Sequence, residues 1–409
     1  MNINVIRLRT VLDDREDTII KTNTDFLEEI NNNLIDDDFI MSEKAADPIM
    51  SIVFVETGGS ETKFLALFEQ LESPIILLSN GQNNSLPASF EIKTYCSLHG
   101  KEGYIITGSE EQCANEIRHF ARVKHAIKAL KNNNLGVIGQ PSDWLIASSM
   151  DAPTVYKYFS INLVNIGMDE LIHEIDKKKM GNVPHLDKLK SKYKNTQVLQ
   201  ESLYIYGALK RLVDKYQLQG LTIRCFDLLG KYKNTACLAL ALLNEEGITS
   251  ACEGDVPALL TMHMLVTLTG RPCFQANPSS IDIEHNTVLL AHCTIPLNMV
   301  SKYELLTHFE SNLGVGIKGT MPLDKVTICK LFIKDGKLLE NSVIATGKIK
   351  ENCSLPGYCR TQILVELEPY PLYSLFQKNF GNHLIVTYAD AEEDFFTLLT
   401  LYEKEKETK

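Results

Sequence analysis

The sequence predicts an α/β protein with two doubly wound parallel-sheet domains, followed by a smaller, mainly antiparallel β domain. Up to about residue 298, short apolar runs alternate with longer amphipathic segments, a pattern typical of parallel strands joined by helices. Beyond that point the apolar runs have strand length and few helical segments separate them. The length of 409 residues also exceeds what one hydrophobic core usually holds, which indicates two or three domains.

The first predicted domain covers residues 1–134 and alternates strands with helices from its start. Expected strands cover residues 5–8, 49–56, 75–78 and 104–107, and expected helices cover residues 24–33, 61–70, 86–98 and 110–131. The polar run at residues 132–134 ends the last of these helices and marks the domain boundary.

The second predicted domain, residues 135–298, continues the same alternation. Expected strands cover residues 135–139, 221–226, 248–252, 272–276 and 287–293, and expected helices cover residues 196–216, 233–244 and 256–268. Polar loops are expected at residues 140–144 and 277–280. Because this reading makes the strands parallel, their carboxyl ends should meet at one edge of a sheet.

The third predicted domain, residues 299–409, consists mainly of strands. Runs 327–333 and 338–347 flank an Asp335-Gly336 pair, which favours a hairpin turn. Further strands are expected at residues 362–367 and 383–388.

Composition excludes several classes of protein. A formal net charge of -11 argues against a nucleic-acid partner, because phosphate binding needs a concentrated positive surface. No apolar stretch is long enough to span a bilayer, and the first residues lack the apolar core of a signal peptide. The ten cysteines are scattered without a CxxC pair, as in proteins with reduced thiols. We therefore expect a cytoplasmic protein without a membrane partner.

Potential metal ligands follow three successive strands of the second domain. Glu253 follows the strand at 248–252, Asp282 lies beyond the loop at 277–280, and His292 is near the end of the strand at 287–293. Carboxylate oxygens with an imidazole suit Mn²⁺ or another divalent cation. The alternative for either acid alone is a helix cap or a solvated loop residue.

Three further residues are candidates for the same cleft. His383 lies at a glycine-bearing turn before an apolar strand, and it would add a second imidazole if the β domain folds over the sheet edge. Asp227 directly follows the strand at 221–226 and could hydrogen-bond a polyol, although a helix-capping role is equally compatible with its position. Trp144 lies in a polar loop, where it could stack on a sugar or anchor the loop.

Several of these motifs resemble the core of the L-fucose and L-arabinose isomerase superfamily. The matching segments are residues 221–227, 251–255, 280–282, 290–293 and 381–383. The resemblance implies a Mn²⁺-dependent aldose-ketose isomerase acting on a free monosaccharide similar to L-fucose or L-arabinose, assembled as a homo-oligomer such as a trimer or hexamer. It implies that Glu253, Asp282 and His383 are metal ligands, that His292 is a further metal histidine, and that Asn382 contacts the sugar.

This chemistry is compatible with the residues themselves. Moving a carbonyl from C1 to C2 requires a proton to leave C2 and return to C1 through an enediol, and a divalent cation stabilises the developing charge. Glu253 and Asp282 could serve as the two acid-base groups, in either order. The alternative is a non-catalytic sugar-binding or regulatory relative that has kept the fold.

Overall fold

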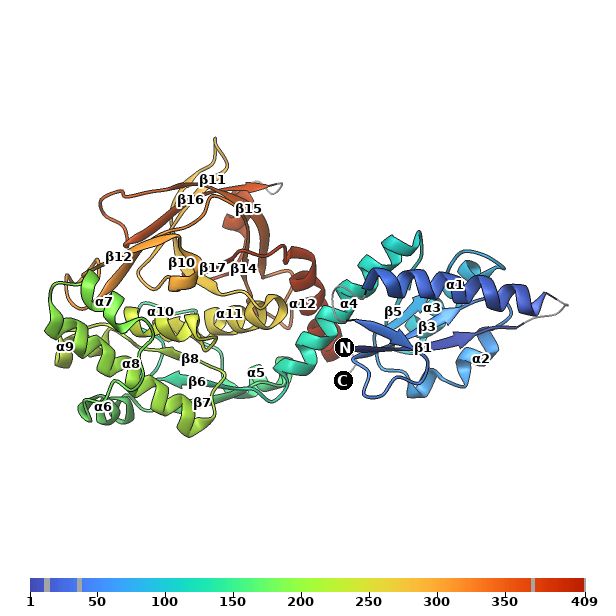
Figure 1. Ribbon diagram of the computed structural model, residues 1–409, viewed down its shortest axis with the longest axis horizontal. Helices are drawn as coiled ribbons and strands as arrows, with labels where there is room; N and C mark the ends of the chain where they lie inside the picture. Colours follow the sequence, from blue (N-terminus) through green and yellow to red (C-terminus); the bar gives the residue numbers. More distant parts are fainter. Residues whose placement is uncertain (11–14, 35–38, 369–371, 408–409) are drawn as a thin grey trace. The chain divides into compact units, whose positions relative to one another are not determined.

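The computed structural model describes residues 1–10, 15–34, 39–368 and 372–407. Contacts within the chain define two compact units, Met1–Lys128 and Ala129–Glu407. The predicted fold class is confirmed: parallel sheets with helices are followed by an antiparallel barrel near the carboxyl end (Figure 1). The division into domains at residues 134 and 298 stays a prediction.

The first unit is a doubly wound sheet of five parallel strands in the order β2-β1-β3-β4-β5. One cluster of buried apolar residues joins the sheet to α1 and α4, and a second joins it to α2 and α3, so helices cover both faces. The strands are β1 (Asn2–Leu8), β2 (Ile40–Ser42), β3 (Met50–Val55), β4 (Ile75–Leu78) and β5 (Gly103–Ile106). The helices are α1 (Glu16–Leu34), α2 (Glu61–Leu65), α3 (Ser85–Leu98) and α4 (Glu110–Leu130).

The second unit begins with a four-stranded parallel sheet in the order β7-β6-β8-β9. Its strands are β6 (Asn134–Ile138), β7 (Asn162–Ile166), β8 (Gly220–Ile223) and β9 (Thr249–Cys252). The helices in this part of the chain are α5 (Ala152–Phe159), α6 (Met168–Asp176), α7 (Leu186–Lys192), α8 (Thr196–Tyr216), α9 (Asp227–Tyr232), α10 (Cys237–Glu245) and α11 (Val256–Thr269).

The rest of this unit is a closed antiparallel barrel in the order β10-β11-β16-β15-β14-β17, beside a two-stranded sheet, β12-β13. The barrel strands are β10 (Cys273–Asp282), β11 (Thr287–His292), β14 (Lys325–Lys330), β15 (Val343–Asn352), β16 (Thr361–Glu368) and β17 (Leu384–Thr387). The other elements are β12 (Lys302–Leu306), β13 (Gly316–Thr320) and α12 (Glu392–Glu407). The predicted pairing across the Asp335-Gly336 turn is confirmed, since β14 and β15 are antiparallel neighbours.

The structure corrects the prediction for the segment after residue 272. It was expected to form a parallel strand and then a loop at 277–280, but β10 continues without a loop to Asp282. The pairing with β11 shifts register between Pro278 and Ser280, and such a bulge accommodates a proline that cannot donate to the ladder. β10 and β11 therefore belong to the barrel and not to the parallel sheet.

Helix α11 lies between the parallel sheet and the barrel, and α10 lies between the same sheet and β13 of the two-stranded sheet (Figure 1). Both helices are apolar on nearly all sides, which is typical of helices buried between two layers. Asp255 caps the amino end of α11, where its carboxylate accepts a hydrogen bond from the backbone N–H of Ala258 at 2.7 Å. This end of α11 positions polar groups between the sheet edge and the barrel.

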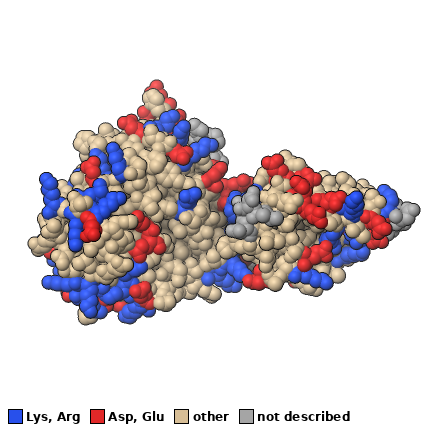
Figure 2. All heavy atoms as spheres, in the orientation of Figure 1, with Lys and Arg blue, Asp and Glu red and all other residues tan. Residues whose placement is uncertain are grey.

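On the face seen in Figure 2, basic side chains gather at the lower left, in the region of α6 and α9, with acidic side chains among them. Ion pairs neutralise part of this charge, including Lys231 with Asp176 at 2.6 Å and Arg211 with Glu174 at 2.6 Å. Within the described ranges, no helix combines the length and apolar character that crossing a membrane requires.

Candidate metal centre

A tight turn after β9 directs Glu253 into the centre of the second unit. Glu253 and Gly254 have φ values of 65° and 74°, in the left-handed region that is strained for a residue with a side chain. A Cβ at Gly254 would lie 2.6 Å from the carbonyl oxygen of Gln140, so only glycine fits there. The carbonyl of Glu253 accepts a hydrogen bond from the N–H of Ser142 at 2.8 Å. The turn therefore fixes the direction of the Glu253 carboxylate.

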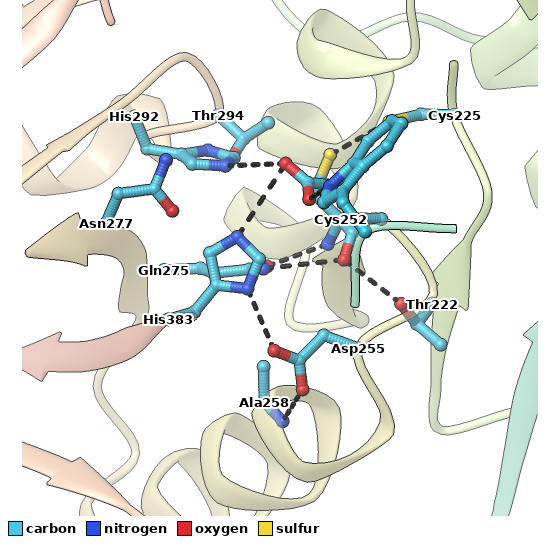
Figure 3. A network of polar contacts seen from close by, with 12 residues as sticks. Thr222, Cys225, Cys252, Asp255, Ala258, Gln275, Asn277, His292, Thr294 and His383 are labelled. Atoms are coloured by element: carbon cyan, nitrogen blue, oxygen red, sulfur yellow. Dashed lines mark hydrogen bonds and ion pairs between the residues drawn. The ribbon is translucent and has the colours of Figure 1, made fainter. Parts of the chain in front are cut away.

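Glu253 meets two histidines from the barrel, His292 and His383. Figure 3 shows how the two imidazole rings lie. His292 is the last residue of β11, and His383 directly precedes β17. Oε1 of Glu253 lies 4.0 Å from Nε2 of His292 and 3.7 Å from Nε2 of His383. Each residue offers one ligand atom, all of these atoms lie within 4.8 Å of one another, and all three residues are buried. This group could hold a divalent cation.

Each of the three side chains is held through its other polar atom. Nδ1 of His292 lies 2.7 Å from the Thr294 hydroxyl, and Nδ1 of His383 lies 2.8 Å from Oδ2 of Asp255. The indole N–H of Trp144 donates to Oε2 of Glu253 at 2.7 Å. Among the described residues, Nε2 of His383 has no hydrogen-bond partner although it is buried. Hydrogen-bond partners such as Thr294 and Asp255, which lie behind the imidazole rings, commonly orient metal-binding histidines.

The charge states suit a cation. Burial opposes the ionisation of Glu253, but His383 and His292 outweigh it and lower the pKa of Glu253 to about 2. Burial and the neighbouring His383 lower the pKa of His292 to about 3, which keeps its imidazole neutral. Burial also acts against a charge on His383, yet the carboxylates of Asp255 and Glu253 raise its pKa. Metal binding needs an ionised carboxylate and unprotonated imidazole nitrogens, so a cation would replace a proton at His383.

A narrow cavity adjoins this group. Its lining includes Asn277, His308 and Glu310 in addition to Glu253 and His292. Oδ1 of Asn277 is buried and has no hydrogen-bond partner among the described residues. Five cysteines also contribute to the wall, and all five are free: Cys225, Cys237, Cys252, Cys293 and Cys359.

The two carboxylates of the cavity have opposite pKa shifts. Glu310 is exposed at the cavity, yet partial desolvation raises its pKa, and the negative charge of Glu253 raises it further. Glu253 has a pKa of about 2 and stays ionised. Pairs of acids whose environments separate their pKa values in this way are typical of acid-base sites.

The structure does not bring Asp282 to this group. Asp282 ends β10, five residues beyond Asn277, which is roughly 16 Å along an extended strand. Its side chain is 51% exposed and bonds to Nδ1 of His285 at 2.8 Å. The expected position after a short parallel strand was wrong, because β10 runs on into the barrel hairpin.

The other predicted residues lie at varying depth around the site. Trp144 is 52% exposed, and its ring meets Phe226 edge-on with 4.8 Å between ring centroids. Asp227 is exposed at the start of α9 and bonds to Arg224 at 2.9 Å. Arg224 also donates to the Pro141 carbonyl and thus holds the loop that carries Trp144. Asn382 is half-buried and directly precedes His383.

Four residues of the site were missed in the sequence. Asp255 precedes Pro257 at the start of a helix, a capping signal that says nothing of a metal. Lys330 interrupts the apolar run at residues 328–333, which could have marked it as a buried ion. Asn277 and Glu310 carry no local signal, since nothing near them in the sequence separates them from loop residues.

No family model matches the chain. The sequence is similar to that of the sulfoquinovose isomerase of Clostridium sp. (strain MSTE9), with 23% identity over 364 residues, which cover 82% of this chain and 79% of that protein. It is also similar to the sulfoquinovose isomerase of Alkalicoccus urumqiensis, with 22% identity and 61% of each chain covered. The sulfoquinovose isomerase of Priestia aryabhattai is 21% identical, with 91% of this chain and 85% of that protein covered.

Proposed function

We propose that the protein is a metal-dependent aldose-ketose isomerase that acts on a monosaccharide. At the coarser level, it is an intramolecular oxidoreductase acting on a sugar, in agreement with four relatives named sulfoquinovose isomerase. The observation that carries the metal dependence is the buried group of Glu253, His292 and His383. Each of these three side chains has a second polar atom that is not a proposed ligand, and that atom has a hydrogen-bond partner of its own.

The proposed ligands are Glu253 Oε1 and Nε2 of both histidines, with Oδ1 of Asn277 as a fourth ligand. The support for Asn277 is its buried oxygen, which lines the same cavity and accepts no hydrogen bond from the described residues. Two oxygens with two imidazoles suit Mn²⁺ or a similar divalent cation. Asp282 is not part of this proposal, since it lies at the far end of β10.

The proton transfers are assigned to the chain's own carboxylates. Glu253 is ionised and would take the C2 proton and return it to C1, while Glu310, with its raised pKa, would protonate the carbonyl oxygen and then take the proton of the C2 hydroxyl. A bound cation would stabilise the negative charge that develops on the sugar oxygens. The N–H of Trp144 would hold Glu253 in the orientation that both tasks require.

The substrate is tested with a panel of sugars in the presence of Mn²⁺. The superfamily resemblance favours a free sugar such as L-fucose or L-arabinose, whereas the similar proteins are named for sulfoquinovose, so the panel includes all three sugars. Turnover of sulfoquinovose alone would assign the substrate of the named relatives instead. The absence of isomerisation with every sugar, despite bound Mn²⁺, would overturn the proposed activity.

Metal binding is expected to quench the intrinsic fluorescence of the protein. Trp144 is the only tryptophan of the chain, and its indole N–H lies 2.7 Å from the carboxylate that would bind the ion. A titration with Mn²⁺, which is paramagnetic, should therefore give a saturable decrease in emission. The His383→Ala variant should lose the response. An unchanged response in that variant would exclude His383 from the metal site.

We also propose a homo-oligomer, a trimer or a hexamer, in which the first unit of one copy completes the site of another. The support is the superfamily resemblance, together with a cavity lined entirely by residues of Ala129–Glu407. Light scattering at assay concentration should give a mass of three or six chains. A monomer with full activity would contradict this proposal.

A further inference from the structure

Lys330 carries a fully buried charge for which the proposed reaction has no use. The residue ends β14, its side chain is 0% exposed, and its ammonium donates to Oδ2 of Asp255 at 2.8 Å. Asp255 is also 0% exposed. Removing two charges from water is expensive, and well-packed apolar residues often serve a core equally well or better. A buried pair of this kind therefore needs a reason beyond stability.

Asp255 links Lys330 to the candidate metal centre. Figure 3 shows Asp255 between His383 and Ala258. Its Oδ1 accepts the N–H of Ala258 at 2.7 Å. Its Oδ2 accepts both the ammonium of Lys330 and Nδ1–H of His383, each at 2.8 Å. The carboxylate is thus held by three donors from the start of α11, the end of β14 and the residue before β17.

We propose that Lys330 is a positioning residue of the metal centre, which acts through Asp255 to hold the His383 ring with Nε2 directed at the ion. The inference rests on the proposed function, since it assigns a role within the same site. Lys330 touches neither the ion nor the sugar. With the ammonium in place, the Asp255 carboxylate has one fixed position, and the hydrogen on Nδ1 of His383 leaves the lone pair of Nε2 free for the cation.

The first test is Mn²⁺ binding to the full chain by calorimetry, without substrate. Lys330→Met keeps the length of the side chain and removes the charge. It should weaken Mn²⁺ affinity by about 10-fold, the lower end of the effect of losing a direct partner of a ligand, because Lys330 acts through Asp255. The matched control is Lys101→Met in the first unit, where the ammonium donates to the carbonyls of Phe68 and Leu71. Lys101→Met should leave Mn²⁺ affinity unchanged.

A double variant separates positioning from stability. Lys330→Met alone leaves the buried Asp255 charge without its ammonium partner and should lower the melting temperature. Adding Asp255→Asn makes the pair neutral with little change in volume, so the melting temperature should recover. In the Asp255→Asn side chain, the amide oxygen must accept the N–H of Ala258, so the amide NH₂ points towards Nδ1 of His383. Nδ1 then has to accept a hydrogen bond, and the hydrogen of the imidazole ring moves to Nε2, the atom proposed to bind the ion. The double variant should therefore be stable but bind Mn²⁺ at least about 10-fold more weakly than the unmutated protein.

The outcomes distinguish this inference from the proposed function. If the unmutated protein binds no Mn²⁺, the metal site and the inference both fail. If it binds Mn²⁺ and Lys330→Met binds equally well, the site stands and Lys330 has no positioning role. If the double variant recovers both the melting temperature and the Mn²⁺ affinity of the unmutated protein, the Lys330–Asp255 pair has a structural role only. If Lys330→Met alone does not fold, Asp255→Asn is compared with and without Lys330→Met, because the ammonium requires the amide oxygen and so keeps the hydrogen on Nδ1 of His383. Weaker Mn²⁺ binding with both changes than with Asp255→Asn alone would support positioning by Lys330, and equal binding would contradict it.

Discussion

Glu253→Gln is expected to lower turnover by at least about 100-fold and to weaken Mn²⁺ binding, while the fold is retained. The amide keeps the shape of the side chain, but it neither accepts a proton nor supplies a negative charge to the ion. The other bonds of the turn do not involve the carboxylate, since the Glu253 carbonyl still accepts the N–H of Ser142. Steady-state kinetics and metal analysis after dialysis would measure the two effects.

The matched control is Asp282→Asn, a change of the same kind at the carboxylate that the structure leaves outside the site. Because Asp282 bonds to His285 at the exposed end of β10, turnover and Mn²⁺ content should stay within about 2-fold of the unmutated protein. A large loss in this variant, with Glu253→Gln nearly normal, would reverse the assignment of the two acids.

Glu310→Gln should reduce turnover by about 100-fold without a change in Mn²⁺ affinity. Glu310 is assigned as the proton donor because it lines the same cavity as Glu253 and because partial desolvation and the charge of Glu253 raise its pKa. A donor is active while protonated, so turnover should fall as the pH rises through this raised pKa. The variant should lose that limb of the pH profile together with most of its activity.

The control for this change is Glu304→Gln on the exposed side of β12, which should leave both kinetics and pH profile unaltered. If Glu310→Gln weakened Mn²⁺ binding as much as it weakened turnover, Glu310 would be a ligand and not an acid. Normal turnover in Glu310→Gln would require another proton donor.

The alternation of strands and helices could be predicted because the hydrophobic periodicity of a strand and that of a helix are both visible within a short stretch of sequence. The same reasoning failed at residue 272, where an apolar run of strand length looks alike in a parallel sheet and in a barrel. What decides between them is the partner strand, and Phe274 pairs with Val386, far along the chain. Local periodicity contains no information on such a pairing.

Sequence reasoning could predict those site residues that lie at the end or the beginning of a strand. Glu253, His292 and His383 each lie at the end or the beginning of a strand, and the structure brings them together. Asp282 was expected there only because β10 was assigned too short. The pairing of Lys330 with Asp255 joins residues 75 positions apart, and it follows from tertiary packing that no local pattern reveals.

The origin of the three proposed ligands has a consequence for the supply of metal in the cell. Glu253 comes from the parallel sheet, whereas both histidines come from the barrel, so the ion would bind only when these two parts are folded against each other. A ligand that binds only the native state stabilises it by about 2.7 kcal/mol at a free concentration of 100 times Kd. Cells starved of the cation would then hold less folded protein, because the unloaded chain unfolds and is degraded more readily. Metal availability would thus set the abundance of the protein as well as its activity.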